Sequence, residues 1–160
     1  MNLLKVVFLA LIFILLHKKS SAQNIDYNEI RDSLTSLTCG KQDKELVNRT
    51  VIKLEAFDTN LLKKNIQQYY YDLGYAYYIQ YAFTNDTNRL RKSIQTLEKA
   101  INHKPKYSVA LWMLSLDYNF LNNCPKSLYY LNRHKKATSK RDGIKSSFVL
   151  LKKNVENSVF

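Results

Sequence analysis

The chain has 160 residues and a formal net charge of +12, because 25 lysines and arginines outnumber 13 aspartates and glutamates. This length suits one domain that buries its own core. The basic residues are spread along the chain with no run of five or six, which is typical of a solvated surface; attraction to an acidic partner or to an anionic surface is the alternative. Two cysteines are too few for a disulfide framework.

The first 22 residues have the features of a secretory signal peptide. Lys5 precedes an unbroken apolar run over residues 6–16, and small residues follow up to Ala22. This run of eleven residues is shorter than the roughly 18 to 20 that span a bilayer as a helix. We expect cleavage after Ala22, which leaves a charge of +9, no transmembrane span and a secreted or periplasmic protein. Lys18 and Lys19 directly follow the run, so retention as an uncleaved anchor is the alternative.

Apolar residues recur at three- and four-residue intervals through the rest of the chain, a spacing that predicts helices. Residues 23–59 are predicted to form an N-terminal helical hairpin, with one helix ending near Cys39 and a second capped by Asp43. A long helix of about 24 residues, capped by Thr59 or Asn60, is predicted next. The remaining helices are predicted over residues 89–102, 106–121, 125–140 and 141–160. With three glycines, two prolines and no long alternating segment, no β-sheet is expected, and the predicted fold is all-α with about seven helices.

Two segments repeat one pattern of large and small residues. The first consists of Tyr70, Leu73, Gly74, Tyr77, Ser93, Leu97, Ala100 and Pro105. The second consists of Leu111, Leu114, Ser115, Tyr118, Ser127, Leu131, His134 and Ser139. We expect the large residues to fill the space between paired helices and the small ones to let the helices approach each other.

This pattern resembles the tetratricopeptide repeat (TPR), in which a helix pair stacks on its neighbours and leaves a concave groove on one side. The resemblance implies a TPR-like α-solenoid, with a first repeat over residues 60–105, a second over 106–140 and a C-terminal capping helix over 141–160. The front halves of the two patterns are 41 residues apart and the back halves 34, so the first repeat is expected to be an extended hairpin with a protruding tip. A related all-α repeat or a plain helical bundle is the alternative.

In proteins of this kind the first helix of each repeat lines the groove. Transferred to this chain, the partner-binding residues are Gln68, Tyr71, Tyr75, Tyr78, Ile79, Val109, Trp112, Leu116, Asn119 and Phe120. Tyrosine and tryptophan are frequent binding anchors because they bury a large area with few rotatable bonds. Trp112 and Tyr75 are the expected anchors if the groove is open. The alternative is that the N-terminal hairpin folds into the groove, so that a partner would bind elsewhere, first at the hairpin tip around residues 83–88.

The sequence offers little for catalysis. It has no glycine-rich phosphate loop, no nucleophile elbow and no metal-binding histidine pair, so we expect no enzyme activity, no cofactor and no metal site. Asp72 and Asp117 are lone aspartates on helices, which are usually solvated. Cys39 and Cys124 could form a disulfide in an exported protein or could be two separate thiols.

These features predict an exported, non-enzymatic protein–protein interaction module that holds a protein or peptide partner in a TPR-like groove. A structural subunit of a larger envelope or secreted assembly is the alternative, and an enzyme is less expected. Nucleic acid is not an expected partner of an exported chain, whereas weak association with anionic surfaces is compatible with the charge.

Overall fold

The computed structural model describes residues 26–39, 43–62 and 64–138, and this part of the chain is helical with no strand. The all-α prediction is therefore confirmed. Six α-helices and one short 3-10 helix follow one another: α2 Tyr27–Cys39, α3 Lys44–Ala56, η1 Thr59–Leu61, α4 Ile66–Thr84, α5 Thr87–His103, α6 Ser108–Phe120 and α7 Cys124–Thr138. The predicted signal peptide and the predicted capping helix over 141–160 lie outside the described residues.

Side-chain caps fix several of the helix starts. The Asp43 carboxylate accepts hydrogen bonds from the backbone N–H groups of Glu45 and Leu46, at 2.9 and 3.2 Å, which confirms the predicted cap of α3. Asp86 caps α5 in the same way, with its carboxylate 2.9 Å from the backbone nitrogen of Asn88. Only Asn85 and Asp86 separate α4 from α5, so most of the hairpin tip around residues 83–88 belongs to the two helices.

The prediction of one long helix starting at Thr59 or Asn60 is wrong. Asp58 instead accepts a hydrogen bond from the backbone N–H of Asn60 and starts the short helix η1. Asn65 then adopts a left-handed conformation with φ of 67°, which a right-handed helix cannot continue through, and α4 begins only at Ile66. The starts of α5, α6 and α7 lie within two residues of the predicted ones.

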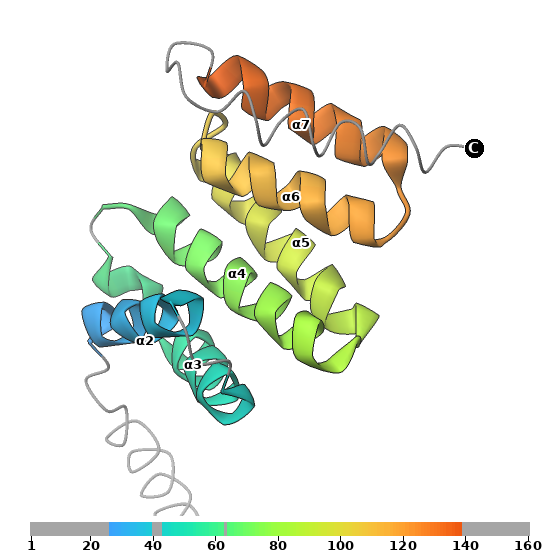
Figure 1. Cartoon of the computed structure of the whole chain (residues 1–160). Helices are drawn as coiled ribbons and strands as arrows, with labels where there is room; N and C mark the ends of the chain where they lie inside the picture. Colours follow the sequence, from blue (N-terminus) through green and yellow to red (C-terminus); the bar gives the residue numbers. More distant parts are fainter. Residues whose placement is uncertain (1–25, 40–42, 63, 139–160) are drawn as a thin grey trace, which may run out of the picture.

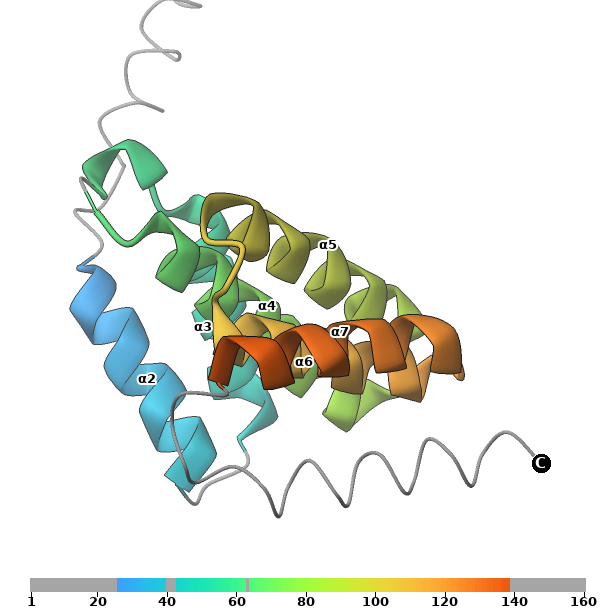
Figure 2. The same ribbon diagram turned by 90° about the horizontal axis from the view of Figure 1, so that it is seen from above.

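The helices are arranged in the order of the sequence, from α2 and α3 at one end to α7 at the other (Figure 1). Each helix contacts the next along the chain. In addition, α4 contacts α2, and α6 contacts α4. Helix α4 therefore packs against both α2 and α3, and α6 packs against both α4 and α5. The view from above shows α7 lying over α6 (Figure 2), and these two helices contact each other.

Two clusters of buried residues form the core. One joins α2, α3 and α4 and includes Ile30, Val47, Leu54, Leu73 and Tyr77. The other joins α5, α6 and α7 and includes Ile94, Leu97, Leu111, Leu114, Tyr118 and Tyr130. Most large residues of the repeated pattern are buried as predicted, whereas Tyr70 is half-buried. The buried ones are Leu73, Tyr77, Leu97, Leu111, Leu114, Tyr118 and Leu131.

Gly74 allows α4 and α5 to approach closely, as the pattern predicts. A Cβ atom at this position would lie 2.7 Å from Cγ of Leu97 and 3.3 Å from the carbonyl oxygen of Ser93. The first distance is shorter than a normal contact between carbon atoms, so any larger residue would push the two helices or the Leu97 side chain aside.

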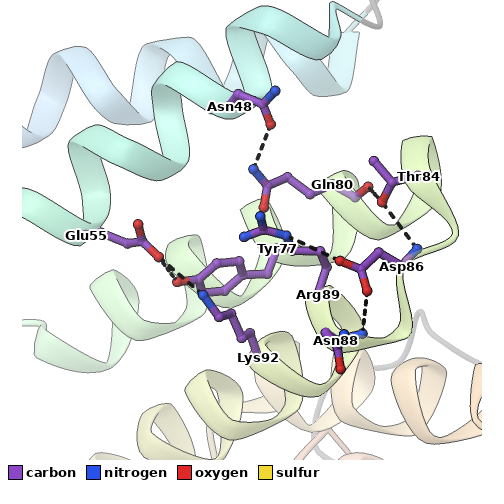
Figure 3. Close-up of polar contacts among 9 residues, drawn as sticks. All are labelled: Asn48, Glu55, Tyr77, Gln80, Thr84, Asp86, Asn88, Arg89 and Lys92. Carbon is purple, nitrogen blue, oxygen red and sulfur yellow. Dashed lines mark hydrogen bonds and ion pairs between the residues drawn. The ribbon is translucent and has the colours of Figure 1, made fainter.

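Polar contacts between α3, α4 and α5 hold the N-terminal helices in place (Figure 3). Gln80 of α4 donates a 2.8 Å hydrogen bond to the side-chain oxygen of Asn48 on α3. Glu55 of α3 accepts the hydroxyl proton of Tyr77 on α4, and the same carboxylate lies 3.8 Å from the ammonium of Lys92 on α5. Because these contacts involve three helices, they fix the orientation of α3 relative to the α4–α5 pair.

Candidate functional site

Aromatic rings from α4 and α6 form a continuous series, which we call the aromatic row. Its members, in spatial order, are Tyr107, Tyr71, Tyr75, Tyr78, Phe120 and Tyr81. Tyr71, Tyr75 and Tyr78 follow the four- and three-residue spacing of one helix face, so their rings stack along α4. Tyr107 and Phe120 approach this stack from the two ends of α6.

The rings contact one another without interruption. The centroids of Tyr71 and Tyr75 are 6.1 Å apart with nearly parallel planes, and those of Tyr75 and Tyr78 are 6.3 Å apart. At one end, Tyr107 meets Tyr71 edge to face at 5.9 Å. At the other end, Phe120 lies 5.9 Å from Tyr78. Such spacings are those of favourable aromatic pairs, so the row is a preformed surface rather than a set of independent side chains.

The row is partly open to solvent. Phe120 is 47% exposed, and the tyrosines of the row are half-buried. Burial raises the pKa of Tyr71 and of Tyr107 to about 12, and it also raises the pKa of Tyr75 and Tyr78. The hydroxyl groups are therefore neutral at physiological pH and can donate hydrogen bonds. The row thus combines apolar ring area with neutral donors.

The row contains four of the residues predicted to bind a partner: Tyr71, Tyr75, Tyr78 and Phe120. Sequence reasoning missed two members. Tyr107 immediately precedes α6 and therefore lies outside the helix face that was used to assign the groove. Tyr81 lies three residues after Tyr78 on α4, a spacing that could have identified it.

The other predicted binding residues are not members of the row. Trp112 and Leu116 pack toward α7, where Leu131 is buried, and the Trp112 ring lies 5.4 Å from that of His134. Ile79 packs against the cluster formed by α2, α3 and α4. Of the remaining two residues on α6, Val109 is 41% exposed and Asn119 is half-buried.

The last of these predicted residues, Gln68, belongs to a hydrogen-bond network around Asp72. Gln68 donates a 2.7 Å hydrogen bond to one oxygen of Asp72 and accepts the hydroxyl proton of Tyr107. The other oxygen of Asp72 accepts the hydroxyl proton of Tyr27 at 2.6 Å and lies 3.4 Å from Nε of Arg31. The network therefore connects α2, α4 and the start of α6, and it holds the ring of Tyr107 at the end of the aromatic row.

The expectation that Asp72 and Asp117 are solvated is wrong. Both are buried, with exposed fractions of 5% and 0%. Burial raises the pKa of Asp72, although the hydrogen bonds from Tyr27 and Gln68 and the charge of Arg31 act in the opposite direction. Burying the Asp72 carboxyl group therefore costs desolvation free energy, and the hydrogen bonds of the network partly offset this cost.

Asp117 lies between α5 and α6. One of its oxygens accepts a 2.6 Å hydrogen bond from the hydroxyl of Ser93, and the other has no hydrogen-bond partner among the described residues. Burial raises the pKa of Asp117 to about 7, and the hydrogen bond from Ser93 only partly opposes this shift. The sequence held a signal for burial, because Ala110 and Leu114 precede Asp117 at seven- and three-residue spacing on the same apolar face.

Other kinds of site receive no support in the part of the chain that the structure describes. There, no three histidines, cysteines or acidic residues come together as metal ligands. No helix within the same residues has the length and hydrophobicity needed to cross a bilayer. The side chain of Cys39 lies outside the described residues, so its pairing with Cys124 stays a prediction.

Comparison with known proteins adds no assignment. A scan against protein-family models finds no match, and searches of curated proteins and of solved structures find none either.

Proposed function

We propose that the chain is an exported, non-enzymatic interaction module whose helices form a TPR-like array, and that it binds a protein or peptide partner through the aromatic row. The observation that carries the proposal is the uninterrupted series of six half-buried or exposed rings across α4 and α6. The absence of catalytic motifs from the sequence favours binding over catalysis.

The order of helix contacts supports the array. Helix α4 packs against both α2 and α3, and α6 packs against both α4 and α5. A contact pattern that recurs from one helix pair to the next is typical of stacked helical hairpins. On this interpretation α2 and α3 form an additional hairpin at the start of the array, so they extend the surface made by α4 and α6 instead of filling it.

The chemistry of the row supports binding. Tyrosine and phenylalanine rings at a surface bury a large apolar area on contact, and the hydroxyl groups of Tyr71, Tyr75 and Tyr78 add hydrogen-bond donors that orient the partner. The Asp72 network and the ring contacts hold these side chains in place before the partner arrives. A preformed surface loses less side-chain entropy on binding than a mobile one.

A matched pair of variants tests the proposal. Phe120 and Tyr129 are both exposed aromatic residues, at 47% and 55%, but Phe120 belongs to the aromatic row and Tyr129 lies on α7. In capture experiments from the envelope of the source cell, we expect one protein to bind the wild type and the Tyr129→Ser variant but not the Phe120→Ser variant. The proposal fails if both variants capture the same proteins as the wild type.

A permanent structural subunit is the second candidate, since Ile52 and Leu61 are 64% and 61% exposed and would provide further contact area near α3 and η1. Light scattering on the purified chain separates the two candidates. An interaction module should be monomeric alone, whereas an obligate subunit should dimerise or aggregate.

A further inference from the structure

The positive charge of this chain is concentrated in its second half. Residues 87–138 contain ten lysines and arginines against two acidic residues, whereas residues 26–86 contain seven against nine. One of the two acidic residues in the second half is the buried Asp117. Helices α5 to α7 therefore carry a large excess of positive charge, and α2 to α4 are close to neutral.

Four of these cations lie in regular positions on α5 and α7. Lys92 and Lys99 are seven residues apart on α5, as are Lys126 and Arg133 on α7. Seven residues correspond to about two helical turns, or about 10 Å, so the members of each pair point to the same side of their helix.

Each of the four cations lies over a tyrosine ring. The ammonium groups of Lys92, Lys99 and Lys126 lie 5.3, 5.8 and 4.8 Å from the nearest ring centroids, which belong to Tyr77, Tyr70 and Tyr118. The guanidinium of Arg133 lies 5.5 Å from the ring of Tyr129 and 5.8 Å from that of Tyr130. These contacts restrict the long side chains while leaving their charge at the surface.

Glu98 joins the two helices between these cations. One of its carboxylate oxygens accepts the hydroxyl proton of Tyr118 on α6 at 3.1 Å and that of Tyr130 on α7 at 3.3 Å. The α5 and α7 surfaces are thus adjacent, and we call the surface formed by Lys92, Lys99, Lys126 and Arg133 the basic face. Glu55 lies at its edge, 3.8 Å from Lys92.

We propose that the basic face docks the protein on an anionic lipid membrane. Cations spaced by about 10 Å on two adjacent helices match a two-dimensional layer of phosphate headgroups better than a single line of phosphates. The exposed Tyr129 beside Arg133 adds an amphipathic ring of the kind enriched at membrane interfaces. The basic face lies on α5 and α7 and the aromatic row on α4 and α6, so the protein could contact a membrane and a partner at the same time.

Vesicle sedimentation with the full chain tests this inference. Vesicles of equal parts phosphatidylglycerol and phosphatidylcholine should bind the protein, pure phosphatidylcholine vesicles should bind it much less, and added salt should release it. The triple variant Lys99→Gln, Lys126→Gln, Arg133→Gln should bind anionic vesicles about 100-fold more weakly, because each cation contributes about fivefold.

A second triple variant provides the control for net charge. This variant removes the same charge from three exposed positions outside the basic face: Lys44→Gln, Arg49→Gln and Lys64→Gln. It should change vesicle binding less than about threefold, since only the long-range attraction is lost. The double variant Lys99→Arg, Lys126→Arg keeps the charge and should retain binding. Circular dichroism confirms that each variant is folded.

Three results would overturn the inference. The first is an equal loss of vesicle binding in the two triple variants, which would mean that net charge alone matters. The second is equal binding to neutral and anionic vesicles. The third is no vesicle binding together with salt-sensitive binding of single-stranded RNA or of a poly-glutamate peptide, which would assign the basic face to another class of partner.

Discussion

Replacing the buried Asp117 with asparagine should change how the stability of the protein depends on pH. Asparagine has nearly the same shape, can still accept the hydrogen bond from Ser93, and carries no charge at any pH. In the wild type, burial raises the pKa of Asp117 to about 7, whereas an aspartate in the unfolded chain has its ordinary value near 3.8. The folded state therefore binds more protons than the unfolded state between about pH 4 and pH 7.

The direction in which stability changes with pH follows from this difference in bound protons. Wherever the folded state binds the extra proton, the free energy of unfolding falls as the pH rises, and the loss is complete once Asp117 ionises in the folded state as well. Three pKa units correspond to about 4 kcal/mol, and relaxation around the ionised group reduces this, so we expect a loss of about 2 to 4 kcal/mol between pH 4 and pH 8. Asp117→Asn should lack this loss and should be more stable than the wild type at pH 8.

Urea unfolding at several pH values, followed by the fluorescence of Trp112, measures both proteins under the same conditions. The buried Asp72 is present in both, so the difference between the two curves isolates Asp117. The reasoning is wrong if the two proteins show the same pH dependence between pH 4 and pH 8, or if Asp117→Asn is the less stable protein at pH 8.

Three further predictions concern packing and processing. Leu114 is fully buried, so Leu114→Ala should lower the free energy of unfolding by about 2 to 5 kcal/mol in urea titrations, and a loss below about 0.5 kcal/mol would contradict the core assignment. Gly74→Ala should cost about 1 to 3 kcal/mol despite the better helix propensity of alanine, because the added Cβ would lie 2.7 Å from Leu97; an unchanged stability would show that α4 and α5 can separate freely. Mass spectrometry of the native protein should find Gln23 at the N-terminus, and recovery of an intact N-terminus in the membrane fraction would contradict cleavage.

The helices could be predicted because their buried residues recur at helical spacing, which a single sequence displays directly. Leu97 and Leu114, for example, occupy predicted core positions and are fully buried. The break before α4 could not be predicted in this way, because the residues before Ile66 continue the same apolar spacing while Asn65 adopts a left-handed conformation that spacing does not reveal.

The aromatic row could be predicted in part and the polar interior could not. Tyr71, Tyr75 and Tyr78 share one face of α4, so the sequence alone aligns them. Asp72 was expected at the surface because an ionisable side chain is usually solvated, but its partners Tyr27 and Arg31 come from α2, a distant part of the chain.

The basic face was hidden in the sequence for a similar reason. The lysines and arginines form no run along the chain, although residues 87–138 carry ten of them against two acidic residues. The sequence does not reveal that cations of α5 and α7 come near one another, which follows from the contacts of Glu98 on α5 with Tyr118 on α6 and Tyr130 on α7. Tertiary packing, which sequence spacing within one helix does not encode, creates this surface.

Photocrosslinking in the source cell is the most direct test of partner binding by the aromatic row. Benzoylphenylalanine replaces Phe120 in one experiment and Tyr129 in the other, since both positions are exposed and accept an aromatic side chain. We predict that irradiation links the position of Phe120, but not that of Tyr129, to one defined protein. Crosslinks to the same proteins from both positions, or from Tyr129 alone, would contradict the proposal that the aromatic row holds the partner.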